Sequence, residues 1–160
     1  MSVLMASESS DKRNNPCVLE NARTEDQRKV MEGINAGGYC PFCMENLLKN
    51  HGKPIIYDGD HWVATENQWP YPAAKFHFLV IAKIHAEKLA DLPKGAGDEL
   101  ISISTFLEEE YSIKSGALCM RFGEPYWNGG TVDHLHAHFI VPDPENEKPL
   151  LFWVDIKKET

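Results

Sequence analysis

Three histidines that alternate along one short stretch are the residues in this sequence best suited to chemistry. His134, His136 and His138 fall at every second position, among only seven histidines in the chain. Such alternation with apolar residues is typical of a half-buried strand. On a strand the three imidazoles share one face, with neighbouring Cα atoms roughly 6.5–7 Å apart. One ring could attack an electrophile, one could stabilise charge, and one could bind a metal or make a structural bond. The alternative is a solvent face that carries histidines without a function.

A pair of cysteines is the second feature with chemical potential. Cys40 and Cys43 form a Cys-x-x-Cys motif, which in a cytosolic chain indicates zinc binding or a redox pair. A redox pair of the thioredoxin type follows a strand and begins a long helix. Here two glycines precede the motif and only a short helix can follow, so zinc is favoured, with a redox or packing role as the alternative. Cys17 and Cys119 are predicted to be unpaired, in a mobile tail and on a strand respectively.

Hydrophobic periodicity and turn residues predict the elements that position these side chains. Thr24 and Gln27 fit a capping box at the start of a helix that two successive glycines would end. A short helix is predicted over 44–49 and a long one over 98–111. Strands are predicted over 54–57, 61–65, 76–81, 117–122, 132–141 and 150–156. The pattern indicates an α+β fold with a mainly antiparallel sheet.

Length and charge limit the possible classes of protein. At 160 residues the chain is predicted to hold a flexible N-terminal arm (1–22) and a single domain (23–160). The net charge of −8 argues against unspecific binding to nucleic acid, which needs a basic surface, but permits a small phosphorylated ligand. No apolar run approaches the ~20 residues of a membrane span, and the N-terminus lacks the apolar core of a signal peptide. A cytoplasmic protein is therefore expected.

Three motifs together resemble one known family. The stretch 134–141 is similar to the His-φ-His-φ-His-φ-φ signature of the histidine-triad (HIT) superfamily of nucleotide hydrolases and transferases. The stretch 77–85 resembles that family's His-x-Leu-Val-Ile-Pro-Lys-x-His strand, and Cys40 to Cys43 resembles the Cys-x-x-Cys of its zinc-bearing branch. The resemblance spans about residues 40 to 142. It implies a HIT-like α+β fold, with a mainly antiparallel sheet of about five strands, a long helix and an N-terminal helix, usually paired as a homodimer.

The resemblance also implies a division of labour among the site residues. His136 would be the nucleophile that attacks the α-phosphate of a nucleotide and forms a covalent nucleotidyl-histidine, with its other ring nitrogen held by a backbone carbonyl. His138 would donate a hydrogen bond to a non-bridging phosphate oxygen as negative charge develops. The loop around Gly130 and Thr131 would complete the anion pocket. His77 would lie beside the nucleophile.

For the metal, the resemblance implies a structural zinc ion with four ligands, because closed tetrahedral sites of thiolates and imidazoles are structural. The implied ligands are Cys40, Cys43, His85 and His134. Binding of His134 would anchor the strand that carries the nucleophile. His77 is the alternative fourth ligand. His51 and His61 are expected to be surface residues.

This chain departs from the family pattern before the triad. Gly123 stands where the family has Asn or Gln, and Gly130 where it has Gln, and both side chains normally contact phosphate or the leaving group. Asn128 could replace one of them. Asn67 lies roughly where the family places a ribose contact, although the loop after it is longer.

The predicted function is therefore hydrolysis at the α-phosphate of a nucleoside phosphoramidate, a mixed anhydride or a dinucleoside polyphosphate. The expected partner is a purine nucleotide or nucleotide conjugate. One alternative is a nucleotidyltransferase or phosphorylase with the same covalent intermediate. The uridylyltransferases of the superfamily have Gln in place of the third histidine and are about twice this length, so His138 favours the hydrolase. The other alternative is a non-catalytic, zinc-stabilised nucleotide-binding module.

Overall fold

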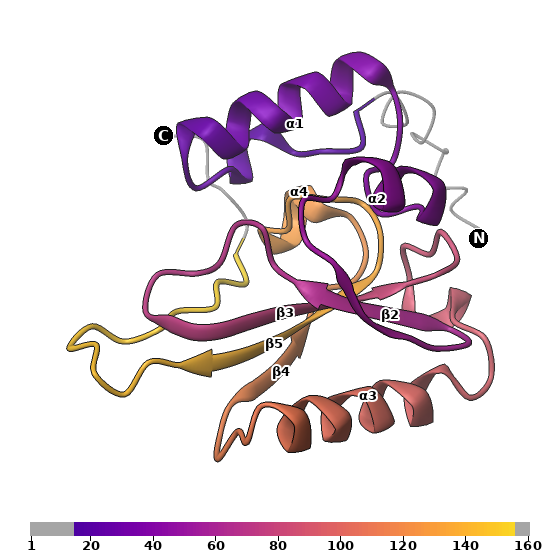
Figure 1. Ribbon diagram of the computed structural model, residues 1–160. Helices are drawn as coiled ribbons and strands as arrows, with labels where there is room; N and C mark the ends of the chain where they lie inside the picture. Colours follow the sequence, from indigo (N-terminus) through magenta and orange to yellow (C-terminus); the bar gives the residue numbers. More distant parts are fainter. Residues whose placement is uncertain (1–14, 156–160) are drawn as a thin grey trace, which may run out of the picture.

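An antiparallel sheet forms the centre of the computed structural model, which describes residues 15–155 (Figure 1). In the described part the sheet has five strands in the order β1-β2-β3-β5-β4, and every adjacent pair is antiparallel. The strands are β1 (Ile55–Asp58), β2 (Trp62–Glu66), β3 (Ala74–Ala82), β4 (Ala117–Met120) and β5 (His136–Pro142). The predicted α+β fold is confirmed.

Helices cover both faces of this sheet (Figure 1). They are α1 (Glu25–Gly37), α2 (Met44–Asn50), α3 (Ala96–Glu110) and the short α4 (Pro125–Asn128), with 3₁₀ turns η2 (Leu19–Asn21) and η3 (Leu89–Asp91). The long α3 lies along one face, whereas α1 and α2 lie over the other. The predicted cap of α1 is present, since Thr24 Oγ1 accepts a hydrogen bond from the Gln27 amide at 3.1 Å. Gly38 ends the helix with a φ of 65°, a conformation that favours glycine.

Side chains alternate between the two faces of β3 and β5, and this alternation separates the core from the site. Toward α3, Phe78 and Ala137 are buried against Ile103 and Leu107, which form the apolar stripe of that helix. On the opposite face, Leu79 belongs to a smaller apolar cluster that includes a residue of α2. The second and third histidines of the triad project from this opposite face, because Leu79 pairs with His138 and Ile81 with His136. The larger apolar cluster thus packs against the face of the sheet opposite to the site.

The triad strand starts four residues later than predicted. β5 begins at His136, so His134 precedes the strand instead of sharing its face. The reason is that the Leu135 amide donates to the carbonyl of Ala86, which lies beyond the end of β3, at 2.6 Å. The imidazole of His134 contacts the end of β3, since its Nε2 lies 2.7 Å from the carbonyl oxygen of Ala82.

The strand predicted over 150–156 is wrong for the part that the structure describes. Residues 150–155 have no strand partner, and Ile156 lies outside the described residues. The carbonyl of Trp153 accepts a hydrogen bond from the side chain of Arg121 at 2.9 Å in place of a ladder bond. This C-terminal segment passes along the site.

Only part of the predicted N-terminal arm can be compared with the structure, because residues 1–14 lie outside the described range. Residues 15–22 contact the loop before β5: Cys17 forms an isolated bridge with Val132, and the Val18 amide donates to the Thr131 carbonyl at 3.0 Å. Cys17 is buried, with 3% exposure, and does not lie in a mobile tail. The side chain of Asn35 contacts both its amide and its carbonyl at 2.9 Å.

The described residues include no helix with the length and apolar character that a membrane span requires.

Candidate active site and metal centre

Four potential metal ligands converge beside the sheet. Their ligand atoms all lie within 4.8 Å of one another, and they belong to Cys40, Cys43, His85 and His134. The cysteines precede α2, His85 follows β3, and His134 precedes β5. Cys40 Sγ lies 3.3 Å from His134 Nδ1, and Cys43 Sγ lies 3.5 Å from His85 Nδ1. The four residues expected from the resemblance are thus together, and the alternative ligand His77 lies elsewhere, against His138.

Hydrogen bonds orient both imidazoles of this cluster. His134 Nε2 lies 2.7 Å from the Ala82 carbonyl oxygen, which can only accept, so Nδ1 carries the lone pair toward the thiols. His85 Nε2 lies 3.3 Å from a Glu87 carboxylate oxygen. Metal-bound histidines commonly donate their second N–H in this way. Burial raises the pKa of the Cys40 thiol to about 12, and a bound cation would favour its thiolate. Two thiols and two imidazoles fit a tetrahedral zinc site.

His136 presents an unprotonated nitrogen to a cavity. Its Nδ1 lies 2.6 Å from the carbonyl oxygen of His134, so Nδ1 carries the proton and Nε2 a lone pair. The ring of Phe42 stands edge-on to the imidazole, with centroids 4.9 Å apart. Burial lowers the pKa of His136 to about 4, so the ring is neutral at pH 7. A neutral imidazole with this tautomer can act as a nucleophile.

A backbone amide determines which nitrogen of His138 carries the proton. The Tyr71 amide donates to His77 Nδ1 at 3.0 Å, so the proton of the neutral His77 ring is on Nε2. His77 Nε2 lies 2.8 Å from His138 Nδ1 and therefore donates to it. The proton of His138 is then on Nε2, the nitrogen on the other side of its ring. Burial lowers the pKa of His77 to about 3 and that of His138 well below its ordinary range, so both rings stay neutral.

Arg121 lies next to this proton, and the sequence interpretation missed it. Its Nη1 lies 3.5 Å from His138 Nε2 and 3.2 Å from the Tyr71 hydroxyl. The guanidinium stacks on the ring of Phe152, 3.9 Å from the centroid, while its Nε donates to the Trp153 carbonyl. Only the strand pairing explains its position. Cys119, two residues earlier, pairs with His138, so alternation turns Arg121 toward the triad face.

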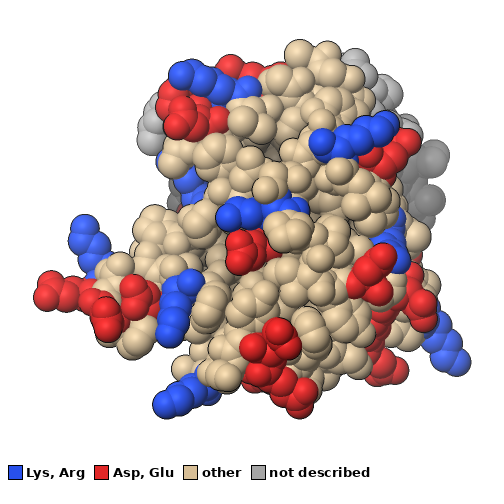
Figure 2. All heavy atoms as spheres, viewed as in Figure 1, with Lys and Arg blue, Asp and Glu red and all other residues tan. Residues whose placement is uncertain are grey.

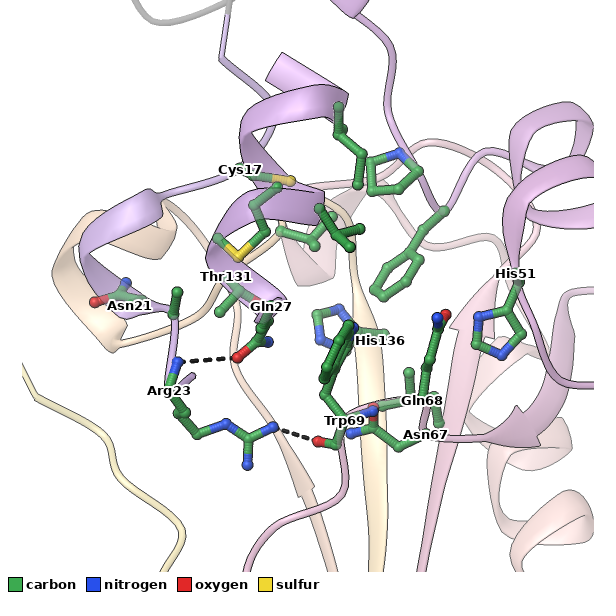
Figure 3. Close-up of a pocket in the computed structure, with 18 of the residues that line it drawn as sticks. Cys17, Asn21, Arg23, Gln27, His51, Asn67, Gln68, Trp69, Thr131 and His136 are labelled. Atoms are coloured by element: carbon green, nitrogen blue, oxygen red, sulfur yellow. Dashed lines mark hydrogen bonds between the residues drawn. The ribbon is translucent and has the colours of Figure 1, made fainter. Parts of the chain in front are cut away.

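Arg23 is a second guanidinium at the same place. It lies 4.2 Å above the ring centroid of Tyr71 and donates to the Trp69 carbonyl (Figure 3). Arg23 is exposed, so it stands at the mouth of the site. No motif marks it in the sequence, because its position depends on how the segment before α1 packs against the loop before β3.

These residues line a cavity of about 640 Å³, which Figure 3 shows from one side. In this view Arg23 and His51 lie on opposite sides of His136. The cavity also has an apolar part to which α1, the loop before α2 and the sheet contribute, with Met31, Ile34, Phe42 and Leu79. Its size and mixed lining suit a small ligand with both apolar and anionic parts.

Of the other predicted site residues, two line this cavity and two do not. Asn67 and Thr131 line the cavity, and Asn67 Nδ2 lies 3.1 Å from His77 Nε2. Asn128 is engaged within its own loop, since its amide donates to the Phe122 carbonyl and accepts from the Gly130 amide, both at 2.9 Å. Gly130 is buried, and its carbonyl accepts from the Asn21 side chain.

His51 and His61, which were expected to be surface residues, are both half-buried. His51 lines the cavity and donates from Nε2 to the Glu66 carbonyl at 3.1 Å, with Thr65 Oγ1 at 3.0 Å. Both partners belong to β2, and no pattern in the sequence around His51 predicts that its imidazole reaches this strand.

Comparisons with known proteins agree with this geometry. The HIT domain family matches residues 49–145. A HIT family hydrolase from Clostridium thermocellum is 27% identical, with a TM-score of 0.52 over 69% of this chain and 96% of that one. No protein of curated function matches the chain.

Two further solved structures share the fold. A histidine triad nucleotide-binding protein from Candida albicans has a TM-score of 0.57 at 18% identity, covering 76% of this chain and 87% of that one. A hypothetical histidine triad nucleotide-binding protein from Sulfolobus tokodaii has a TM-score of 0.51 at 24% identity, covering 75% and 81% respectively.

Proposed function

The chain belongs to the HIT family, and we propose that it is a hydrolase acting at the α-phosphate of a nucleotide conjugate through a covalent nucleotidyl-His136. One observation carries the proposal. His136 Nε2 carries a lone pair and His138 Nε2 carries an N–H. The two rings line one cavity, and their centroids are 5.0 Å apart. A nucleophile beside a hydrogen-bond donor suits attack on a phosphorus atom whose oxygens gain negative charge.

The reaction has two steps. In the first, His136 Nε2 attacks the α-phosphorus, the bond to the leaving group breaks, and that group departs with the electron pair. His138 Nε2–H donates to a non-bridging oxygen as charge develops there. In the second step, water attacks the same phosphorus, the P–N bond breaks, and nucleoside monophosphate and a proton are released. The lone pair returns to His136 Nε2, which the His134 carbonyl keeps unprotonated.

Zinc is the metal that we propose for the cluster of Cys40, Cys43, His85 and His134. When bound, it supplies a closed structural crosslink and no open coordination position for chemistry. Its effect on the reaction is positional, because His134 is also the residue whose carbonyl orients His136.

We place a purine nucleoside in the apolar part of the cavity. Phe42 and Leu79 lie there, next to His136, and a base could pack on them while Asn67 contacts the sugar. A nucleotide as the ligand is supported by the names of the Candida and Sulfolobus proteins, which are described as nucleotide-binding. The Clostridium protein, described as a hydrolase, supports the reaction class.

The test is the intact mass of the protein after brief mixing, without acid, with adenosine 5′-phosphoramidate. The expected result is a transient adduct of one adenosine monophosphate that is absent in His136→Ala and present in the control His61→Ala. Release of free adenosine monophosphate identifies a hydrolase. Efficient transfer to added phosphate instead identifies the transferase alternative. Nucleotide binding with neither adduct nor turnover would contradict the proposal and leave a binding module.

A homodimer is the assembly that we propose from the family resemblance. A mass near the 18.1 kDa of one chain in light scattering at micromolar concentration would contradict it.

A further inference from the structure

Two hydrogen-bond donors face the same small space beside His138. The tautomer set by the Tyr71 amide puts a proton on His138 Nε2, and Arg121 Nη1 lies only 3.5 Å from that nitrogen. A guanidinium has no acceptor, so these two groups cannot satisfy each other. An anionic ligand that places one oxygen against His138 Nε2–H and another against Arg121 would satisfy both donors.

The cavity concentrates positive charge in a chain whose net charge is −8. Among its described lining residues the basic side chains are Arg23, Lys29 and Arg121, and the acidic one is Asp155. Neither Arg23 nor Arg121 forms an ion pair with a carboxylate in the part of the chain that the structure describes. The guanidiniums of Arg23 and Arg121 both contact Tyr71 and repel each other. An anion bound between them would offset that repulsion.

The face of the molecule drawn in Figure 2 does not share this character. On the face drawn in Figure 2, the described acidic and basic side chains are interspersed, and no broad basic patch is seen. Compared with this face, the cavity has a local excess of positive charge, which suits a small anion.

The basic groups are linked by a series of contacts that begins at the nucleophile and ends at an exposed residue. The rings of His136 and His138 are 5.0 Å apart, Arg121 lies against the far nitrogen of His138, and Arg23 stands at the exposed mouth over Tyr71. Neighbouring donors of this kind suit phosphates attached to an α-phosphate at His136.

We propose that Arg121 and Arg23, with the Tyr71 hydroxyl, form a second anion subsite that binds a phosphate chain attached to the α-phosphate. The inference rests on the proposed function, because the α-phosphate must lie at His136 for its neighbour to reach Arg121. When the bond between the α-phosphorus and the bridging oxygen breaks, the electron pair stays on that oxygen, and Arg121 lies where the charge develops. The substrates would therefore be nucleoside polyphosphates, including dinucleoside polyphosphates, in preference to phosphoramidates or carboxylic mixed anhydrides.

A binding measurement tests the subsite without turnover. Calorimetry at constant ionic strength would compare adenosine monophosphate with α,β-methylene adenosine diphosphate, which differ by the second phosphoryl group. Wild type is expected to bind the diphosphate analogue about tenfold more tightly or better, the effect of one charge-assisted hydrogen bond. Equal affinities would overturn the inference while leaving the proposed function intact. Failure to bind either nucleotide would contradict the proposed function itself.

Matched variants locate the effect. Arg121→Gln should abolish the preference for the diphosphate analogue and Arg23→Gln should reduce it. Arg28→Gln should keep it, because Arg28 pairs with Glu32 on α1 and does not line the cavity. A preference that survives in both cavity variants would overturn the inference. Should Arg121→Gln fail to fold, Arg23→Gln, at an exposed position, still decides the result together with the wild-type ratio.

Turnover gives a second, independent readout. The ratio of kcat/KM for diadenosine tetraphosphate to that for adenosine phosphoramidate should fall at least tenfold in Arg121→Gln. An equal loss for both substrates would mean that Arg121 acts on the shared α-phosphate or on the fold, and would contradict a leaving-group subsite.

Discussion

The main-chain carbonyl of His134 lies 2.6 Å from Nδ1 of His136, while the imidazole of His134 belongs to the Cys40, Cys43 and His85 cluster. One residue thus connects the candidate metal centre to the candidate nucleophile. Any movement of the cluster would move the carbonyl that keeps His136 in its reactive tautomer. A structural metal can therefore affect chemistry at a distance from any substrate.

Removal of a metal ligand should therefore destabilise the fold and reduce activity together. Wild type is expected to contain about one zinc ion per chain by elemental analysis, and Cys40→Ser to lose most of it. The free energy of unfolding should fall by more than about 4 kcal/mol, since the loss of a bound metal is among the largest single-site effects. The control is Cys119→Ser, because Cys119 lies outside the cluster. The four-ligand site would be contradicted if the wild-type protein contained no metal and Cys40→Ser left the free energy of unfolding unchanged.

Replacement of His77 by Phe should lower kcat on the order of 10²-fold with little change in KM, because His138 then loses the donor that keeps its proton on Nε2. The direct readout is the ¹⁵N chemical shifts of the His138 ring, which report the tautomer without any substrate. His61→Phe serves as the control. Unchanged ring shifts in His77→Phe would mean that another group determines the His138 tautomer.

Stability should decrease as the pH falls from neutrality. Burial, together with the nearby charges of Arg23, His136 and Arg121, lowers the pKa of His77 from 6.5 to about 3. Between these values the unfolded chain binds a proton at His77 that the folded chain does not bind. One such group contributes a slope of up to about 1.4 kcal/mol per pH unit, with the stability fully present above pH 6.5.

Urea unfolding at pH 7.5, 6.5 and 5.5 would measure this slope. His77→Phe should show a shallower dependence than wild type, since one of the buried neutral histidines is gone. Equal slopes in the two proteins would show that His77 does not titrate differently on folding.

The N-terminal cap of α1 should contribute measurably to stability, because α1 covers the cavity. Thr24→Ala removes the hydroxyl that accepts from the Gln27 amide and should cost about 1 kcal/mol of unfolding free energy. Thr105→Ala is the matched control, since Thr105 is exposed and only donates back to the Ile101 carbonyl within α3. Similar losses in the two variants, measured by urea unfolding, would argue against the cap.

Several features could be predicted from the sequence because they depend on short-range patterns. The cap at Thr24 and the stop at Gly38 are local to one helix, and both are present. The alternation of the triad is local to one strand, and it correctly grouped His136 with His138. The convergence of Cys40 and Cys43 with two distant histidines is not local. It was expected only through the family resemblance, and the structure has it.

Other features were decided by the tertiary structure alone. Arg121 reaches His138 because β4 pairs with β5 in one particular register, and a shift of one residue would turn its side chain to the other face. Arg23 meets Tyr71 because two segments far apart in the sequence pack together. The strand predicted over 150–156 is wrong for the same reason. The segment has β propensity, but its Trp153 carbonyl accepts a hydrogen bond from the Arg121 guanidinium instead of from a partner strand. The sequence alone thus determined which residues could do the chemistry, whereas the charges around the leaving group depend on long-range pairing that no local pattern encodes.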